Sequence, residues 1–300
     1  MKAVLMKGYG KADQLEYAEV EQPSPGAGEV LVRVEATSVN PVDWKIREGA
    51  FMKGQFELPL ILGRDVAGEV VELGAGVNGL RQGDRVMGMV NHAYAEFLVA
   101  KPEDLARIPE GLNTEDAGAL PLILQTGSQL IELGVEPKPG MTVLITGAVG
   151  SVGRTAVFVA KQHGAEVIAG VRRRQEQQAA ALGADRVVAI DDDRAIESLG
   201  EVDAIADTVD HDVIGKLIPH LRKGGILGTV VGKPNAAEGK EIQVNQVVAR
   251  PDAKRLRTLA EAVAKGDLKI PISARLPLSR AGEAQDKAEK GAEGKILLVP

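Results

Sequence analysis

The sequence has no cysteine among its 300 residues. Disulfides, thiol nucleophiles and zinc sites with thiolate ligands are therefore excluded. Aromatic residues make up only 3% of the chain, which disfavours a large stacking platform for nucleobases or flat polycycles. The sequence also lacks an uninterrupted apolar run of about 20 residues, the length that spans a bilayer. We therefore expect no membrane partner.

Positive charge is also in deficit. The formal net charge is -6 and the isoelectric point is near 5.4, whereas a nucleic-acid-binding face normally shows an excess of Lys and Arg. We therefore expect no nucleic-acid partner. The first residues, Met1 to Lys7, become polar too soon for a secretory signal, so we expect a cytoplasmic protein. Hydrophobic residues at 44% and charged residues at 26% are typical of a folded globular chain.

The pattern of the sequence changes twice along the chain. Residues 1–122 hold short β-like runs separated by Gly and Pro, which is typical of a barrel or sandwich. In residues 123–249 strands alternate with helices, the pattern of a parallel sheet, and six expected strands suit a dinucleotide-binding fold. Residues 250–300 end on another β-like run, which we expect to return to the first domain. The expected strands are 3–6, 30–36, 67–72, 85–89, 95–99, 142–146, 166–171, 186–190, 204–207, 226–231, 242–247 and 295–299.

A glycine-containing turn follows the first strand of the second domain. It lies between the strand 142–146 and an amphipathic helix that we expect to end at Gly164. A diphosphate needs bare backbone N–H groups at the start of a helix, and glycine leaves room for it. The alternative is a turn with a purely structural role. The residues expected to bind the cofactor here are Ala148, Gly150, Ser151, Val152 and Gly153.

The next strand indicates which dinucleotide binds. An NAD site has an acidic residue at the end of this strand to bind the ribose 2'-hydroxyl, but here Val171 is followed by Arg172, Arg173 and Arg174. Guanidinium groups bind phosphate in fork geometry, so we predict NADPH as the cofactor, with Val171, Arg172 and Arg173 at the site. The alternative is that the arginines begin a solvated helix, and three of them cannot all reach one phosphate. Gly232, later in the second domain, is a further cofactor-binding candidate.

Short motifs follow one another from one end of the chain to the other. They are Asn40-Pro-Val-Asp43, Leu62-Gly-Arg-Asp-Val-Ala-Gly68, Gly83-Asp-Arg-Val86, Ala93-Tyr-Ala-Glu-Phe97, Gly147 to Gly153, Leu182-Gly-Ala-Asp185, Gly224-Gly225 and Gly294-Lys-Ile296. In this order they resemble the medium-chain dehydrogenase/reductase superfamily, and most closely its zinc-free quinone oxidoreductase branch. The resemblance implies an α/β protein in which a Rossmann domain, a doubly wound parallel sheet, is inserted into a GroES-like, mostly β catalytic domain. It also implies a homodimer and hydride transfer from NADPH to a quinone or an α,β-unsaturated carbonyl compound.

Zinc-dependent relatives bind their metal through cysteine and histidine, and such a ligand set cannot be built here. The resemblance places Arg64 where those relatives have a histidine ligand. Asn40 and Asp43 fall in the segment that supplies a cysteine. The histidines have spacings that suggest no metal site, so we predict a zinc-independent protein without a bound metal. They are His92, His163, His211 and His220.

Reduction of a conjugated carbonyl without a metal needs a group that stabilises negative charge on the oxygen, and a proton donor. Lys45 stands where quinone reductases often have a tyrosine and is one candidate, with a surface lysine as the alternative. Tyr94 is the second candidate, with a packing residue as the alternative. The resemblance implies that Asn40 orients the nicotinamide or the substrate carbonyl and that Thr126 lies beside the nicotinamide.

The sequence leaves two functions open. The first is a zinc-independent, NADPH-dependent oxidoreductase that acts on a quinone or an enone. The second is a non-catalytic NADPH-binding sensor or structural protein of the same fold, because the glycine loop serves a binding site and an active site equally well.

Overall fold

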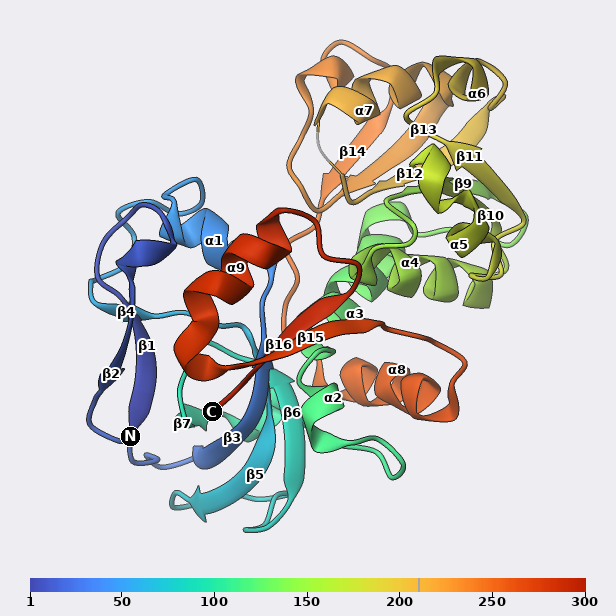
Figure 1. Ribbon diagram of the computed structural model, residues 1–300. Coiled ribbons are helices and arrows are strands. Elements are labelled where there is room, and N and C mark those ends of the chain that lie inside the picture. Colours follow the sequence, from blue (N-terminus) through green and yellow to red (C-terminus); the bar gives the residue numbers. More distant parts are fainter. Residues whose placement is uncertain (210) are drawn as a thin grey trace. The chain divides into compact units, whose positions relative to one another are not determined.

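The computed structural model describes residues 1–209 and 211–300, with only the backbone described for His211. The chain forms two compact units (Figure 1). Unit 1 consists of Met1–Leu122 and Pro251–Pro300, and unit 2 consists of Ile123–Arg250. These bounds differ by at most one residue from the predicted segments.

Unit 1 is built mainly from antiparallel strands. Its larger sheet has seven strands, in the order β15-β16-β3-β5-β6-β8 with β7 paired to β3, and its smaller sheet has the order β2-β1-β4. Only β15 and β16 pair in parallel within these described sheets. The strands are β1 (Lys2–Met6), β2 (Leu15–Glu19), β3 (Val30–Ser38), β4 (Leu60–Ile61), β5 (Asp65–Leu73), β6 (Arg85–Met89), β7 (Phe97–Ala100), β8 (Leu105–Arg107), β15 (Ile272–Pro277) and β16 (Lys295–Val299).

The last strand carries the end of the chain back into the first sheet. β16 runs antiparallel to β3, with Leu297 opposite Ser38 and Leu298 opposite Thr37. Leu297 and Leu298 are fully buried, and burying a leucine side chain stabilises a fold by about 1.5–3 kcal/mol. The predicted return of the chain to the first domain is therefore confirmed.

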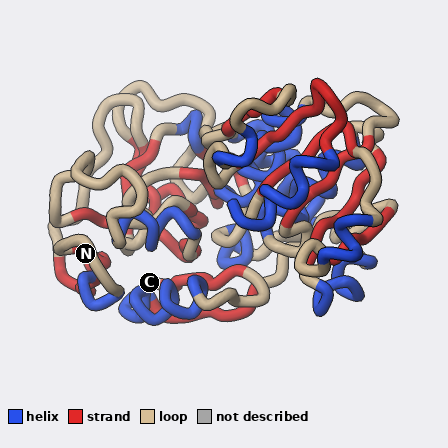
Figure 2. The backbone as a smooth tube through the Cα atoms, turned by 90° about the horizontal axis from the view of Figure 1, so that it is seen from above, coloured by secondary structure: helices blue, strands red, loops and turns tan. Residues whose placement is uncertain are grey.

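Helices of 4 to 13 residues lie between the strands of unit 1; Figure 2 shows the helices of the chain in blue and its strands in red. The first of the helices was not predicted from the sequence, because it is brief and lies among β-like runs. It follows Asn40, whose backbone N–H donates to Asp43 at 2.8 Å, and it begins at Pro41, whose fixed φ suits a first helical position. The helices are α1 (Pro41–Arg47), α2 (Thr114–Ala117), α8 (Ala253–Lys265) and α9 (Ala281–Glu289).

Unit 2 is a parallel six-stranded sheet with the strand order β11-β10-β9-β12-β13-β14. This is the doubly wound order of a dinucleotide-binding fold, so the predicted fold class is confirmed. The prediction for β13 was wrong at both ends, because the strand already pairs with β12 at Leu221 and ends at Thr229. The strands are β9 (Thr142–Thr146), β10 (Glu166–Val171), β11 (Arg186–Ala189), β12 (Val202–Asp207), β13 (Leu221–Thr229) and β14 (Gln243–Gln246).

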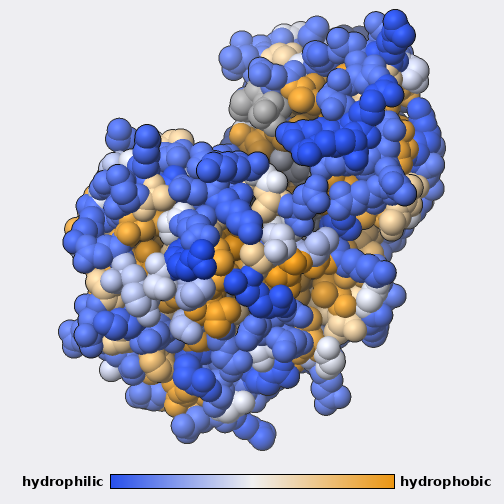
Figure 3. Space-filling view, in the orientation of Figure 1, coloured by the Kyte–Doolittle hydropathy of each residue, from blue (hydrophilic) through white to orange (hydrophobic). Residues whose placement is uncertain are grey.

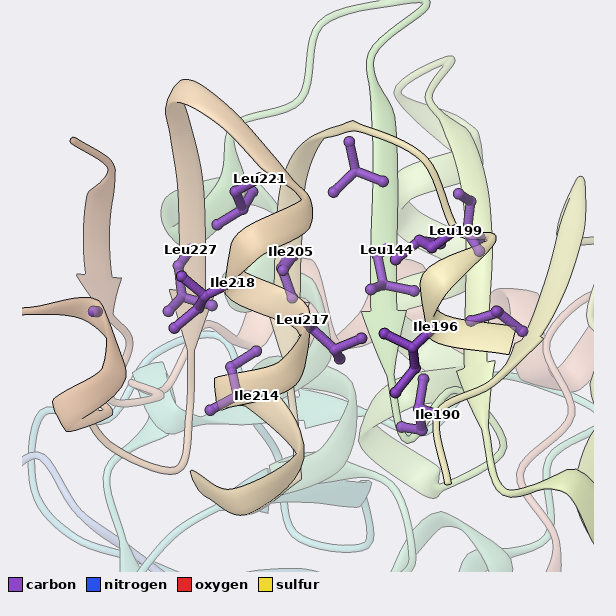
Figure 4. Packing of buried hydrophobic residues seen from close by; sticks show 14 residues of the cluster. Leu144, Ile190, Ile196, Leu199, Ile205, Ile214, Leu217, Ile218, Leu221 and Leu227 are labelled. Carbon is purple, nitrogen blue, oxygen red and sulfur yellow. The ribbon is translucent and has the colours of Figure 1, made fainter. Parts of the chain in front are cut away.

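Helices and strands of unit 2 share an aliphatic core. Figure 4 shows Leu144, Ile205 and Leu227 of the sheet facing Ile214 and Leu217 of α7, and all five are fully buried. Successive strand residues point to opposite faces, so the residues between them serve the other face, where α4 crosses from β9 to β10 (Figure 1). The helices are α3 (Pro121–Gln129), the π-helix η3 (Leu130–Val135), α4 (Ser151–Gln162), α5 (Glu176–Ala180), α6 (Asp193–Glu197) and α7 (His211–Leu217).

The face drawn in Figure 3 is mainly polar. In Figure 3 hydrophilic residues cover most of the visible face, with smaller apolar areas between them. Within residues 1–209 and 211–300, no helix combines the length and the apolar character needed to cross a lipid bilayer. The large hydrophobic side chains that remain exposed are Tyr17, Phe51, Met52, Leu58, Leu73, Leu133 and Val248.

Candidate functional site

The strand order of unit 2 reverses between β9 and β12. The chain passes from β9 to β10 and β11 on one side, and then returns to β12 on the other side. Ligands of open parallel sheets bind at the carboxyl ends of the strands where the order reverses. The loop after β9 and the residues at the end of β12 therefore form the first candidate site.

The loop after β9 turns sharply into α4. Gly147 has a positive φ of 61°, which favours glycine, and the N–H of Gly150 donates to the Gly147 carbonyl at 2.8 Å. A Cβ atom at Gly153 would lie 2.2 Å from the Gly147 oxygen, so only glycine lets α4 start this close to the turn. Ala148 is fully buried, and its N–H donates to the Gly170 carbonyl at 3.2 Å.

The first turn of α4 offers backbone donors. Arg154 has the first amide that reaches a carbonyl one turn back, that of Gly150 at 2.8 Å. The amides of Ser151, Val152 and Gly153 precede it, and such first-turn amides have no partner within their own helix. Together with the positive end of the helix dipole they fit a diphosphate group.

Arg154 adds a positive charge beside this loop. Its Nε donates to the Val149 carbonyl at 2.9 Å, and the side chain is largely buried. No ion pair links Arg154 to an acid in the described part of the chain. Burial lowers the pKa of its guanidinium from the usual value. The sequence reasoning missed this residue, although its place four residues after Gly150 could have indicated a contact with the loop.

Two other predicted residues flank the loop or the neighbouring strand ends. Thr126 is half-buried on α3, and a Cβ atom at its neighbour Gly127 would lie 2.6 Å from the Val152 carbonyl, so α3 approaches the first turn of α4 closely. Gly232 has a positive φ of 112°, and its carbonyl oxygen lies 3.2 Å from the hydroxyl oxygen of Thr229. Both lie in unit 2 near residues of the candidate site.

A buried polar group ties the strand ends together. The hydroxyl of Thr146 donates to Asp207 at 2.9 Å, and that of Thr229 donates to Asp207 at 3.1 Å. These residues end β9, β12 and β13, and all three are fully buried. The sequence reasoning missed them, although an aspartate at the end of an apolar strand was a usable signal.

The arginines after β10 are exposed. The guanidinium of Arg173 forms an ion pair with Asp192, and its backbone N–H donates to Asp191 at 2.7 Å. Arg172 and Arg174 form no ion pair with residues 1–209 or 211–300. β10 itself ends on Val171 without an acid, as predicted from the sequence, but β11 brings acids to the same place.

Unit 1 contains a second polar cluster, around Asn40. The Asn40 side chain is fully buried. Its Nδ2 donates to Asp65 at 2.7 Å and to the Ser38 carbonyl at 3.3 Å, and its Oδ1 accepts from Lys295 at 2.6 Å. The amide is therefore engaged inside the unit, so the orienting role predicted for Asn40 stays a prediction.

Lys295 and Asp65 form the charged centre of this cluster. Their Nζ and Oδ2 atoms lie 3.6 Å apart, and both side chains are almost completely buried. Asp65 also accepts hydrogen bonds from the Ser38 hydroxyl at 2.5 Å and from the Leu122 backbone at 2.6 Å. Burial lowers the pKa of Lys295, and the nearby carboxylates oppose that shift. The sequence reasoning did not identify either residue as part of a site.

Tyr94 meets Asp43 in the interior. The Tyr94 hydroxyl donates to Asp43 at 2.9 Å, and both residues are fully buried. Burial raises the pKa of Asp43 to about 6 and the pKa of Tyr94 well above its ordinary value. A Cβ atom at Gly63 would lie 2.5 Å from the Tyr94 ring. The structure thus favours the alternative in which Tyr94 is a packing residue.

Comparisons with known proteins agree with these features. The model of the alcohol dehydrogenase GroES-like domain matches residues 26–110, and the model of the zinc-binding dehydrogenase matches residues 182–298. The chloroplast envelope quinone oxidoreductase homolog of Arabidopsis thaliana is 33% identical in an alignment of 326 positions, gaps included, which covers 100% of this chain and 98% of that protein. The chain belongs to the medium-chain dehydrogenase/reductase superfamily.

Two further similar proteins of this medium-chain dehydrogenase/reductase are named as an alkenal/one and a quinone oxidoreductase. The NADPH-dependent alkenal/one oxidoreductase of Arabidopsis thaliana chloroplasts is 26% identical over 100% of this chain and 80% of its own length. The quinone oxidoreductase of Coxiella burnetii has a TM-score of 0.92 and 30% identity, with 100% of this chain and 99% of that chain covered. This chain is therefore an oxidoreductase of a nicotinamide-dependent family.

Two further solved structures differ in the cofactor that they name. One is an NAD-dependent alcohol dehydrogenase, with a TM-score of 0.89, 27% identity and 100% coverage of both chains. The other is a mycobacterial protein in complex with NADPH, with a TM-score of 0.87, 25% identity and 100% coverage of both chains. The superfamily fold is thus shared by proteins of either cofactor.

The residues that the family resemblance aligns with zinc ligands form other contacts here. Arg64 forms a hydrogen bond with Asn91, and Asp43 bonds to Tyr94 and Asn40. Among residues 1–209 and 211–300, no group of three or more His, Asp or Glu side chains is placed to hold a metal ion. The side chain of His211 lies outside the described part of the chain.

Lys45 is the catalytic candidate that the structure leaves exposed. It lies on α1, and its side chain is in contact with solvent. On the same helix, Asp43 and Ile46 are buried. The Lys45 side chain is open to solvent, whereas Tyr94 is fully buried.

Proposed function

We propose that this protein is a zinc-independent, NADPH-dependent oxidoreductase that transfers hydride to a quinone or an α,β-unsaturated carbonyl compound. The observation that carries the proposal is the similarity over the whole chain to quinone oxidoreductases, combined with arginines in place of an acid after β10. The neighbour solved with NADPH supports the choice of cofactor. The neighbour named as NAD-dependent makes that choice the part most in need of a test.

The residues of unit 2 would bind the dinucleotide. The amides at the start of α4 would bind the diphosphate, with Arg154 as a nearby charge. Arg172, exposed after Val171, would bind the 2'-phosphate. When bound, the reduced nicotinamide supplies the hydride. Thr126 would lie beside the nicotinamide, as the family resemblance implies.

The residues of unit 1 would act on the substrate. The ammonium group of Lys45 would stabilise negative charge on the substrate oxygen or donate the proton. Asn40 would act as a positioning residue, because its amide joins Lys295 and Asp65 in one buried cluster. Zinc independence is supported by the absence of cysteine and by the arginine at position 64.

A turnover assay tests this proposal against the non-catalytic alternative. We expect the purified protein to oxidise NADPH when given an ortho-quinone or a simple enone, and to do so equally after exhaustive chelation. Tight binding of NADPH without turnover across such a panel would favour the sensor or structural protein instead.

Replacing Lys45 tests its catalytic role. General acid catalysis contributes typically about 10²- to 10⁴-fold to a rate, so Lys45→Ala should lower kcat towards that extent with little change in the Kd of NADPH. Lys101→Ala is the control, because Lys101 is also exposed in unit 1. Equal activities of the two variants would remove Lys45 from the mechanism.

The homodimer and the cytoplasmic location stay predictions. The sheet of unit 2 ends on β14, and the exposed Val248 lies just beyond that strand. An edge strand offers unpaired backbone groups to a second copy. Sedimentation of the purified chain would measure the oligomeric state directly.

A further inference from the structure

Two neighbouring carboxylates already bind the cationic segment after β10. β10 and β11 are parallel neighbours, with Val171 opposite Ala189, so the residues after the two strands meet at one sheet edge. Asp191 accepts a hydrogen bond from the Arg173 backbone at 2.7 Å, and Asp192 forms an ion pair with the Arg173 guanidinium. The backbone N–H and the guanidinium of Arg173 therefore each face a carboxylate.

A phosphate at this edge would need the same donors. Guanidinium groups bind phosphate and carboxylate in the same fork geometry, so Asp192 competes with a 2'-phosphate for Arg173. A carboxylate next to the phosphate also repels it. No carboxylate competes in this way for Arg172, because Arg172 forms no ion pair within residues 1–209 and 211–300.

We propose that Asp192 is a specificity-determining residue, which limits the preference for NADPH over NADH by holding the guanidinium of Arg173. The proposal rests on the proposed function, since it assumes that unit 2 binds a dinucleotide. Arg172 then provides most of the discrimination between NADPH and NADH. Arg173 contributes little to it, because its guanidinium stays paired with Asp192. The preference for NADPH is accordingly weaker than three adjacent arginines would suggest.

Asp192→Asn removes the ion pair with Arg173 but keeps the side-chain cap of α6. Asp192 caps α6, since its Oδ1 accepts hydrogen bonds from Arg194 at 2.9 Å and Ala195 at 3.4 Å. Asparagine caps helices as well as aspartate does, so the variant should fold with α6 intact. It removes only the charge that holds Arg173.

The expected gain is modest because the pair is partly exposed. The side chains of Arg173 and Asp192 are 65% and 22% exposed, and exposed ion pairs contribute little, so release should change affinity by about 2- to 5-fold. Asp192→Asn should therefore lower the Kd of NADPH by this factor. The Kd of NADH should stay unchanged, because NADH carries no 2'-phosphate.

Asp193→Asn is the matched control. Asp193 is the next residue and carries the same charge, but it pairs with Lys216 at 2.7 Å and not with an arginine after β10. The control changes the net charge of unit 2 by the same amount at almost the same place. We expect its Kd for NADPH to equal that of the unchanged protein.

Fluorescence titration of all three proteins with NADPH and with NADH, at one low ionic strength, decides the matter. Tighter NADPH binding in Asp192→Asn alone supports the proposal. An unchanged or weaker Kd in Asp192→Asn, or the same gain in Asp193→Asn, overturns it while the proposed function stands. If the unchanged protein binds neither dinucleotide, the proposed function falls and this inference falls with it.

Discussion

At the scale of single residues, the buried charges of unit 1 are the least predictable feature. Lys295 opens an apolar strand and looks like a surface lysine in the sequence, yet it is 5% exposed and bonds to Asn40, 255 residues away. The spacing of residues in the sequence cannot predict such a contact, because it forms only when β16 pairs with β3. The same return brings Lys295 close to Asp65.

Asp43 makes the stability of the fold depend on pH. Its pKa rises from 3.8 to about 6, first because of burial and also because Asp65 lies near, while the bonds from Asn40 and Tyr94 and the charge of Lys295 oppose the rise. A raised carboxyl pKa contributes stability below the unfolded value, and this contribution is lost as the pH rises through the folded value. The shift corresponds to about 3 kcal/mol in the free energy of unfolding.

Asp43→Asn tests that dependence. Asparagine keeps an oxygen acceptor for Tyr94 but cannot ionise, so the free energy of unfolding of the unchanged protein, relative to the variant, should fall by up to about 3 kcal/mol between pH values of about 4 and 7. Urea unfolding at several pH values measures the difference. Parallel stability curves for the two proteins would contradict a raised pKa for Asp43.

At the scale of elements, strands whose ends are marked by a change of residue type were predictable, and short helices were not. The predicted bounds of β9, β10 and β16 are those of the structure, since the apolar runs there are followed by Gly147, Arg172 and Pro300. α1 has seven residues, too few for a helical period to appear beside β-like runs. β13 was misplaced because its start is polar and contains two glycines.

In the proposed function, the loop after β9 and the first turn of α4 bind the diphosphate together. Arg154→Met removes the hydrogen bond to the Val149 carbonyl and the positive charge beside the loop, and losing about 1 kcal/mol of attraction between that charge and a diphosphate weakens binding roughly fivefold. Because both dinucleotides contain the diphosphate, the Kd values of NADPH and NADH should rise together. Lys161→Met is the control on the same helix, since Lys161 pairs with Asp185. A loss confined to NADPH would place Arg154 at the 2'-phosphate instead.

At the scale of the whole molecule, the order of the motifs was more informative than any one of them. A glycine turn alone is a weak signal, but motifs from Asn40 to Ile296 in sequence order indicated the superfamily, and the comparison over the full chain shows it. The order of the motifs does not predict the substrate, because substrate choice depends on which side chains surround the reacting atoms. Asn40 and Tyr94, two of the predicted catalytic candidates, form buried hydrogen bonds with Asp65 and Asp43.

The most direct test of the account compares kcat/KM for NADPH and NADH with the same ortho-quinone, after exhaustive chelation. Loss of a charge-assisted phosphate contact weakens binding by about 10- to 150-fold, so with Arg173 held by Asp192 we predict a preference for NADPH near the lower end of that range. Chelation should leave both values unchanged. The proposed zinc-independent, NADPH-dependent activity would be contradicted by equal kcat/KM values for the two cofactors, by a preference for NADH, or by loss of turnover on chelation.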